Sequence, residues 1–438
     1  MSGPLRNVWL RTHRWVGILA GAVLAVVGST GALMAFEDEI VHALNQDVRV
    51  RTARPEPPLD APALLARVRA QASGQRVLSL EMAGREGAAA RVTLESESAR
   101  DAPDPREGRS QREVRYADPY TGALIRADGT RGEAFFRGVR ALHRWLVIGP
   151  WGDRDVGRQI VGACVALFVL LQLSGLYLRW PRTLRGLRGT LWLDLRRRGR
   201  ARLWNQHVVL GTWALPVYLV IALTGLTWSY DGYRSVVYAL AGVEEPARGE
   251  RRRGESSTSA DDLAGSEADL RATWQELARI AASEPVHAME ASAERSALGL
   301  RQVTFRLPES PGDPVRVRYL AAQAAHSRAY DELVVDERTG QVVQHERYAD
   351  KPVGARWMAS RLALHTGGFW GLGGQAVFLL ASLALPVVVV TGAGLFLRGA
   401  QRRRAARSRP AAPDLAAVPR PEASPTLAGE DPGVASGM

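Results

Sequence analysis

The chain contains, near its start, the uncharged segment Val16-Gly-Ile-Leu-Ala-Gly-Ala-Val-Leu-Ala-Val-Val-Gly-Ser-Thr-Gly-Ala-Leu-Met-Ala-Phe36. Three later segments also lack Asp, Glu, Lys and Arg, namely Ile160–Leu178, Val208–Tyr230 and Ala376–Leu397. Each has about the 20 residues that a helix needs to cross roughly 30 Å of hydrocarbon. The first segment runs directly into Glu37 without a small-residue cleavage site, so we interpret it as a retained helix rather than a signal peptide. The sequence therefore predicts a membrane α-helical fold with a four-helix transmembrane bundle.

Arginine carries most of the positive charge in this chain of 438 residues, whose net charge is +12, and it gathers beside the uncharged segments. The three clusters are Arg6, Arg11 and Arg14; Arg179, Arg182, Arg185, Arg188, Arg196, Arg197, Arg198, Arg200 and Arg202; and Arg398, Arg402, Arg403, Arg404 and Arg407. Arginine next to a transmembrane helix marks the cytoplasmic side. We therefore predict that both termini are cytoplasmic, that 37–155 and 231–375 lie outside, and that the charge does not signal a nucleic-acid partner.

The chain divides into two halves of the same plan, each with a helix, an extracytoplasmic module and a second helix. The first half comprises the cytoplasmic N-terminus and first helix (1–36), the first module (37–155) and the second helix (156–178). A basic cytoplasmic loop (179–206) leads to the third helix (207–230), the second module (231–375) and the fourth helix (376–398). Within the second module, 242–269 has the composition of a flexible linker. The tail, 399–438, is predicted to be disordered and cytoplasmic.

Each extracytoplasmic module has an α+β pattern. The first shows helical spacing at Ala61–Ser73 and strand-like segments at Arg76–Met82 and Ala90–Leu94, and the second repeats this with a helix at Ala268–Ala282 and strands at Gln302–Leu307 and Val315–Tyr319. In both modules a later strand ends in Asp-x-x-Thr-Gly, at Asp118–Gly122 and Asp336–Gly340, which is favourable hairpin chemistry. The sequence therefore predicts an internally duplicated protein.

Four of the eight histidines occupy repeated positions. His13 and His207 stand at the cytoplasmic ends of helices one and three, and each is followed four residues later by glycine, at Gly17 and Gly211. His143 and His365 precede helices two and four on the outer side. This arrangement predicts one histidine pair at each membrane face.

Imidazole is a good axial ligand for haem iron, and two histidines on facing helices can hold a haem inside a bundle. Gly17 and Gly211 lie one turn from their histidines on the same helix face and leave room for a flat macrocycle. Arg140, Arg144 and Arg361 flank the outer pair and could neutralise haem propionates. Copper or zinc would have only two imidazole ligands per face, which is fewer protein ligands than these metals usually have. We therefore predict two b-type haems, with the four histidines as iron ligands.

Two alternatives remain for these histidines. Histidines at a membrane interface also serve as simple anchors of helices, although their paired repetition favours ligation. His42, near the outer end of helix one, is a rival for the outer site. His287, His326 and His345 are interpreted as ordinary surface residues of the modules.

Several chemistries are excluded by what the sequence lacks. The single cysteine, Cys164, rules out an internal disulfide framework and a cysteine-ligated cluster. We find no dinucleotide-binding Gly-rich motif, no phosphate-binding loop and no Ser/His/Asp signature. The sequence offers no catalytic residue apart from the prospective haem ligands.

The chain resembles the PepSY-associated transmembrane proteins, often called iron-regulated or iron-uptake membrane proteins, over about residues 5–400. The resemblance rests on His13-Arg-Trp-Val-Gly17, Leu142-His143-Arg144, His207-Val-Val-Leu-Gly211, Leu364-His365-Thr-Gly367 and the two Asp-x-x-Thr-Gly turns. It implies two PepSY-like modules on the four-helix bundle, and a bacterial inner-membrane protein with two haems that reduces ferric siderophores in the periplasm. The cytoplasmic flavoreductase domain that is fused to some relatives is missing here.

These observations predict transmembrane electron transfer to a ferric siderophore or another periplasmic acceptor, with quinol or a separate cytoplasmic reductase as donor. Such a protein would be a haem-dependent oxidoreductase in the lipid bilayer. The alternative is a non-enzymatic membrane anchor whose PepSY-like modules bind or restrain a periplasmic protein. A transporter is weaker, because the uncharged helices offer no ionisable pathway.

Overall fold

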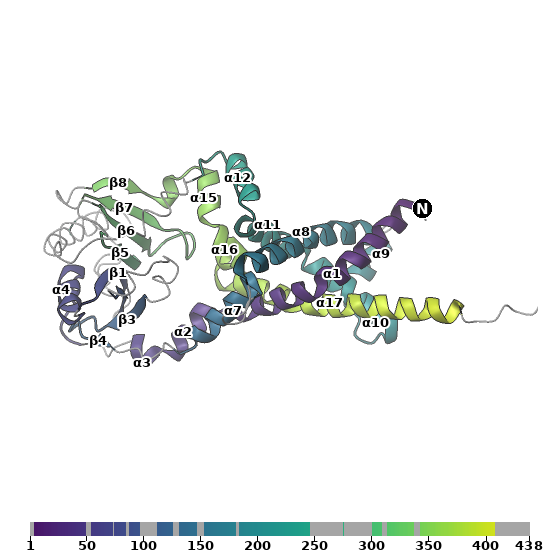
Figure 1. Ribbon diagram of the computed structural model, residues 1–438, viewed down its shortest axis with the longest axis horizontal. Helices are drawn as coiled ribbons and strands as arrows, with labels where there is room; N and C mark the ends of the chain where they lie inside the picture. The colour runs from purple at the N-terminus through teal and green to yellow at the C-terminus, as the bar shows by residue number, and fades with distance from the viewer. Residues whose placement is uncertain are drawn as a thin grey trace, which may run out of the picture.

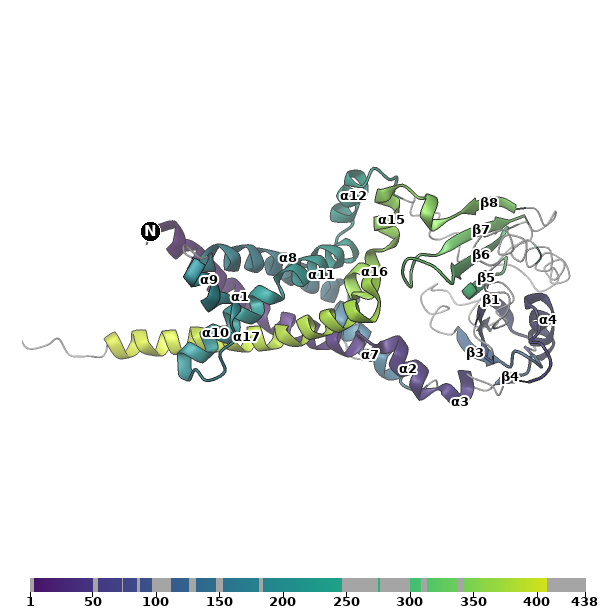
Figure 2. The ribbon, with the colours of Figure 1, turned by 180° about the vertical axis from the view of Figure 1, so that it is seen from behind.

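The structure, a computed structural model, describes residues 4–49, 54–72, 74–84, 87–96, 112–125, 131–146, 153–180, 184–245, 275, 300–308, 313–336 and 342–407. A bundle of long helices stands at one end of an elongated molecule and a β-sheet at the other (Figure 1). The chain starts at the end of the bundle remote from the sheet, and α17 ends there too, as Figure 2 shows from behind. We call this the far end, and the opposite end of the bundle the sheet-side end.

Among the described residues, three helices are long and apolar enough to cross a membrane, namely α1 (Pro4–Met34), α8 (Arg154–Arg179) and α17 (Gly371–Arg407). The helices α10 (Gly199–Trp213) and α11 (Leu215–Ser229) meet at 61° and count as a fourth span if they are taken together. The break follows from Pro216 in the first turn of α11, because proline cannot continue the hydrogen bonding of a preceding helix. The prediction of a membrane protein with several apolar helices is confirmed.

The bundle packs through a small apolar core. Helix α1 lies against α8 and α17, α10 against α17, and α11 against α8. Buried residues from these helices include Leu24, Phe168, Tyr218 and Leu385. The Tyr218 hydroxyl donates to the Ala381 carbonyl at 2.9 Å, which satisfies a donor that has no water to bind.

The strands form one antiparallel sheet in the order β4-β3-β2-β1-β5-β6-β7-β8. The first half supplies β1 (Arg76–Ala83), β2 (Ala90–Glu95), β3 (Glu113–Ala117) and β4 (Leu124–Ile125), and the second supplies β5 (Leu300–Arg306), β6 (Val315–Ala321), β7 (Asp331–Val335) and β8 (Val342–Glu346). The halves meet where β1 pairs with β5, with Leu80 opposite Phe305. The two predicted modules therefore share one sheet.

One face of the sheet forms a core with α4 (Ala61–Gln71). Its side chains Leu80, Val92, Phe305 and Leu333 are buried together with apolar residues of α4. Asp60 caps the N-terminus of this helix, because its carboxylate accepts from the Ala63 N–H at 2.9 Å. This pattern confirms the α+β composition of the region predicted from residues 61–94.

Short helices connect the sheet with the bundle. On the first half these are α2 (Glu37–Leu44), α3 (Gln46–Arg49) and α7 (Glu133–Trp145), and on the second they are α12 (Asp231–Leu240), η2 (Tyr348–Asp350), α15 (Val353–Ala359), α16 (Arg361–Thr366) and η3 (Gly368–Trp370). A further helix, α9 (Leu184–Leu191), lies near the far end.

Two predicted segments differ from the structure or lie outside it. Helix α17 continues to Arg407, whereas disorder was predicted from residue 399. Alanine and arginine have high helix propensity, and positive charge is favourable at a helix C-terminus, so the helix extends. Residues 408–438, most of the linker 242–269 and all but one residue of the helix at Ala268–Ala282 lie outside the described residues.

The first Asp-x-x-Thr-Gly segment forms the predicted turn. The Asp118 carboxylate accepts from the Tyr120 N–H at 2.8 Å, and the Gly122 N–H donates to the Asp118 carbonyl at 2.8 Å. Gly122 has a φ of +71°, which favours glycine. The second such turn lies partly outside the described residues.

Candidate functional site

The four repeated histidines meet in two pairs, one toward each end of the bundle. His13 of α1 and His207 of α10 have ring centres 6.2 Å apart near the far end. His143 of α7 and His365 of α16 have ring centres 6.5 Å apart at the sheet-side end. The ring planes cross at 88° and 75°, so neither pair is stacked face to face. Along α1, the 17 residues from His13 to Thr30, which contacts His143, correspond to about 25 Å at about 1.5 Å per residue.

The sheet-side pair is held by threonine hydroxyls. His143 Nδ1 lies 3.0 Å from Thr30 Oγ1 and 3.1 Å from the Val27 carbonyl, both on α1. His365 Nδ1 lies 3.0 Å from Thr224 Oγ1 on α11. Each threonine already donates to a carbonyl one turn earlier in its own helix, at 2.7 Å for Thr30 and 2.6 Å for Thr224. The hydroxyl oxygens are therefore left to accept from the imidazoles.

The far pair repeats this arrangement on the other two long helices. His13 Nδ1 lies 2.8 Å from Ser174 Oγ on α8, and that hydroxyl donates to the Leu171 carbonyl at 3.2 Å. His207 Nδ1 lies 2.9 Å from the Val388 carbonyl on α17. Thr391 Oγ1, on the same helix as Val388, lies 3.4 Å from the same His207 nitrogen.

These contacts fix the tautomer of each imidazole. Because the partners of Nδ1 are carbonyl and hydroxyl acceptors, Nδ1 carries the proton, and Nε2 keeps a free lone pair. No hydrogen bond to Nε2 of these four histidines occurs among the described residues. Metal-binding histidines have this organisation, in which the second ring nitrogen donates to an oriented acceptor.

A glycine lies against the edge of each ring. An added Cβ would stand 3.4 Å from His143 Cε1 at Gly31, 3.3 Å from His365 Cε1 at Gly225, 3.3 Å from His13 Cε1 at Gly175 and 3.0 Å from His207 Cε1 at Gly392. Each of these glycines directly follows the serine or threonine that contacts the same histidine. Each imidazole thus lies against a Ser/Thr-Gly pair in a helix of the bundle.

The two glycines predicted to face a macrocycle have space around them. A Cβ on Gly211 would meet nothing within 4 Å, and a Cβ on Gly17 would lie 3.8 Å from Leu171 Cδ2. This space is compatible with a flat group beside the far pair. Its use for that purpose stays a prediction.

The three arginines predicted to flank the sheet-side pair have different surroundings. Arg361 stands over the Trp228 ring at 5.5 Å, and Trp228 contacts the His365 ring edge-on at 5.3 Å. Arg144 stands over the Trp145 ring at 5.0 Å. Arg140 forms an ion pair with Glu37, so its interpretation as an anion ligand competes with that contact.

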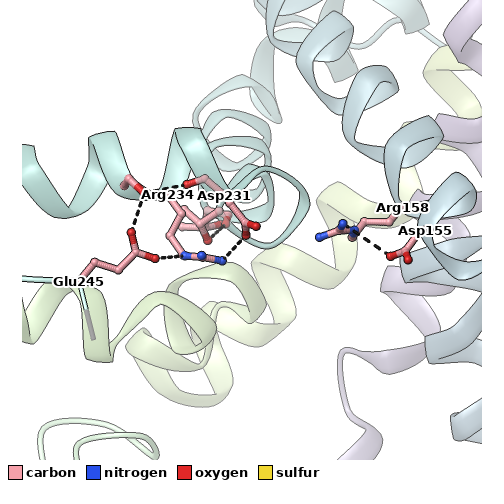
Figure 3. Close-up of polar contacts among 8 residues, drawn as sticks. Asp155, Arg158, Asp231, Arg234 and Glu245 are labelled. Atoms are coloured by element: carbon pink, nitrogen blue, oxygen red, sulfur yellow. Dashed lines mark hydrogen bonds and ion pairs between the residues drawn. The ribbon is translucent and has the colours of Figure 1, made fainter. Parts of the chain in front are cut away.

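The charged ends of the neighbouring helices are compensated locally. Arg234 of α12 binds Asp231 at 2.8 Å and Glu245 at 2.7 Å, and Arg158 of α8 binds Asp155 at 3.6 Å (Figure 3). These ion pairs engage one arginine in the first turns of α8 and one in α12. Arg361, beside the histidine pair, instead donates from Nε to the Met358 carbonyl at 3.1 Å.

The remaining histidines lie elsewhere. His42 is on α2, and the ring partner of His143 is His365 rather than this rival. His345 Nε2 contacts the Tyr319 hydroxyl at 2.7 Å within the sheet. His287 lies outside the described residues. Across the part of the chain that is described, no cluster of three or more His, Cys, Asp or Glu could hold a metal ion.

His326 is buried, with 5% of its surface exposed, so its interpretation as a surface residue is wrong. Its Nε2 lies 2.9 Å from Ser360 Oγ and 3.0 Å from the Tyr348 hydroxyl, and its Nδ1 accepts from the Arg328 N–H at 3.1 Å. Burial lowers the pKa of His326. The residue joins the β6–β7 loop to the start of α16, the helix that carries His365.

The comparison with protein families covers nearly all of these elements. The family profile described as "PepSY-associated TM region" matches residues 10–398. The chain belongs to this family. Its members named by that description are membrane proteins, in agreement with the long apolar helices of the bundle. No curated protein matches the chain at a significant level.

The contact of each histidine with a Ser/Thr-Gly pair was not predicted from the sequence, although two of these pairs belong to its visible repeat. Each uncharged segment contains one such pair, at Thr30-Gly31, Ser174-Gly175, Thr224-Gly225 and Thr391-Gly392. Two of them stand seventeen residues after His13 and His207, a spacing visible in the sequence. The same dipeptide in all four segments was the available signal.

Proposed function

We propose that this protein carries electrons across a membrane through two haems, one at each histidine pair. The observation that carries the proposal is the fourfold repetition of one imidazole setting: Nδ1 bound to a helix acceptor, Nε2 free, and a glycine at the ring edge. Chance packing of histidines gives no reason for four equivalent settings on four different helices. The proposal takes the bundle as four spans, with α10 and α11 as one, and the sheet as two PepSY-like modules joined at β1 and β5.

The pair separations agree with ligation of a single metal between two rings. An imidazole nitrogen binds a metal at about 2.0 Å and lies about 1.1 Å from its ring centre, so opposed rings have centres about 6.2 Å apart. The separations here are 6.2 and 6.5 Å. Two imidazoles without carboxylate or thiolate partners suit a metal whose other ligands come from a macrocycle. Haem b fits these residues better than bare zinc or copper.

Bound haem iron would supply reversible one-electron chemistry at each pair. The residues of the chain would set the conditions for it. His13 and His207 would hold one haem, and His143 and His365 the other. Thr30, Thr224 and Ser174 would fix the imidazole tautomers, and Arg144 and Arg361 would balance propionate charge on the sheet side.

The positive-inside rule places the far end on the cytoplasmic side, because the arginine clusters adjoin that end of the helices. We infer a bacterial inner-membrane protein with both termini in the cytoplasm and the sheet in the periplasm. Electrons would come from quinol or a separate cytoplasmic reductase. Each would reduce one Fe(III) to Fe(II) in a siderophore outside, and the softer ion is held more weakly by hard oxygen ligands. In that role the protein is a ferric-siderophore reductase.

The test compares an iron complex with its gallium analogue, which has the same shape but no accessible reduction. Dithionite-reduced protein should be reoxidised faster by the ferric siderophore than by the gallium complex, as followed by visible absorbance. His143→Ala should slow this reoxidation while the far pair remains reducible. Equal rates with iron and gallium would contradict the proposal and favour a membrane anchor that binds a periplasmic protein.

A further inference from the structure

The sheet has a polar face opposite the core that it shares with α4. Cross-strand partners lie on the same side of an antiparallel sheet, and successive residues of a strand alternate between faces. Leu80 and Phe305 face α4, so their neighbours Ser79, Glu81 and Arg306 lie on the opposite face. Figures 1 and 2 place α4 on the side of the sheet remote from the bundle. The polar face is therefore turned toward the sheet-side end and its histidine pair.

In one row across this face, each charged side chain has a partner of opposite charge. Its paired positions are Arg91, Glu81, Thr304, Arg318, Glu332 and Glu346 in order across the strands. Arg91 lies 3.9 Å from Glu81, and Arg318 lies 3.0 Å from Glu332. Glu346 binds Lys351 at 3.1 Å. The acids of this row are thus already engaged with bases other than Arg306 and Arg316.

The adjacent row places two arginines directly opposite each other. Ser79 pairs with Arg306, Arg306 with Arg316, and Arg316 with Val334. Both arginines are exposed, and among the described residues neither makes an ion pair. Like charges opposite each other on neighbouring strands destabilise a sheet. Among the described residues, no acidic side chain offsets this unfavourable pairing.

We propose that Arg306 and Arg316 form an anion-binding site on the polar face of the sheet, and that the protein takes an anionic ferric chelate there. Two guanidinium groups from neighbouring strands can bind several oxygens of one polyanionic ligand through charge-assisted hydrogen bonds. The acceptor class is then a catecholate or carboxylate complex with net negative charge. A neutral hydroxamate complex offers these groups no charge to bind. The site gives the chemical class of the bound chelate independently of electron transfer. Only the role of that chelate as electron acceptor rests on the proposed function.

Binding is measured without any electron transfer, on full-length protein in nanodiscs of zwitterionic lipid. The probes are a gallium tricatecholate, which is anionic, and a gallium trihydroxamate, which is neutral. The wild-type protein should bind the tricatecholate more tightly. The double variant Arg306→Gln/Arg316→Gln should lose at least roughly tenfold in affinity, because each charged hydrogen bond contributes about that much.

The matched control is Arg318→Gln, which removes an arginine from the same face but breaks an existing pair with Glu332. It should lower the melting temperature and leave anion affinity within about twofold. The double variant should melt at the same or a higher temperature, since it removes a like-charge pair. Loss of binding with unchanged or raised stability separates a ligand site from a structural role.

Three results would overturn the site: equal binding of the two gallium complexes, unchanged affinity in the double variant, or an equal loss in Arg318→Gln. Haem-free protein that still binds the tricatecholate through Arg306 and Arg316 would support the site while the electron-transfer proposal fails. A haem-loaded protein with no preference for the anionic complex would contradict the anion site and leave the electron-transfer proposal standing.

Discussion

At the scale of single residues, the setting of each histidine depends on a hydroxyl or carbonyl that accepts from Nδ1. Thr224 both donates to the Val220 carbonyl and accepts from His365, so its side chain is fixed at both ends. An oriented acceptor raises the basicity of a ligating imidazole and typically changes metal affinity by about 10–100-fold. In the proposed haem sites, the hydroxyls would therefore contribute to metal affinity together with the imidazoles.

Thr224→Val removes this acceptor with little change of volume. We expect weaker haem retention at the sheet-side pair and a higher reduction potential there, because the imidazole becomes a poorer donor. Redox titration followed by absorbance measures both quantities. Thr227→Val is the control, since Thr227 is buried on the same helix but donates only to the Thr224 carbonyl. Equal effects of the two variants would show that Thr224 acts through helix stability alone.

His326 should make the stability of the folded chain depend on pH in a defined direction. Its folded pKa is below the ordinary value of about 6.5, so below that pH the unfolded chain binds a proton that the folded chain does not. Stability should be full above about pH 6.5 and fall as the pH is lowered.

His326→Gln should flatten the difference in melting temperature between pH 7.5 and 5.5, about one unit either side of the ordinary pKa. Nearby Asp331 titrates in both proteins and contributes the opposite sign, because burial raises its pKa. The contribution of Asp331 to the pH dependence of the melting temperature therefore cancels when the variant is compared with the wild type. An unchanged pH dependence in His326→Gln would assign the titration to another group. His345→Gln, with its half-buried ring in the sheet, is the matched control.

At the scale of helices and strands, the close approach of each ring to a glycine makes the helix position itself part of the site. Gly392→Ala would place a Cβ 3.0 Å from His207 Cε1, so the ring must move by a few tenths of an ångström. We expect a high-spin fraction at the far pair and no change at the sheet-side pair. Low-temperature EPR distinguishes high-spin from low-spin haem iron. Gly373→Ala, in the same helix with nothing within 4 Å, is the control and should leave both signals unchanged.

Much of this element scale could be predicted from the sequence. The uncharged segments locate the long helices, and the alternating residues of 76–94 and 302–319 locate four strands within one or two residues of their observed bounds. The pairing of His13 with His207 and of His143 with His365 follows from their repeated positions. These features depend on local patterns, which a sequence carries directly.

Long-range contacts could not be predicted in the same way. The similar segments Gly175-Leu-Tyr-Leu-Arg179 and Gly394-Leu-Phe-Leu-Arg398 align Gly394 with Gly175. The glycine that meets His207 is nevertheless Gly392, two residues earlier. The first helix is continuous, whereas its counterpart breaks between α10 and α11, so the halves do not superpose residue by residue. The burial of His326 likewise arises from three segments that meet only in the folded chain.

At the scale of the whole molecule, the joining of β1 with β5 makes the two outer halves one body. That body is connected to the bundle through α7 on one half and α15 and α16 on the other, and α7 and α16 each carry a histidine of the sheet-side pair. The polar face of the sheet, to which both halves contribute strands, is turned toward the end of the bundle that carries this pair (Figure 1). The duplication accordingly gives the protein two similar histidine pairs at opposite ends of the bundle, and one sheet beyond the sheet-side end.

The most direct test of the central claim is the haem content of protein purified from haem-replete cells, measured by pyridine haemochrome against protein concentration. The account predicts close to two b-type haems per chain with low-spin spectra, because four imidazoles give two irons with two axial ligands each. His13→Ala or His207→Ala should perturb one haem, and His143→Ala or His365→Ala the other. A colourless wild-type protein, or one whose haem content is unaffected by all four substitutions, would contradict the account.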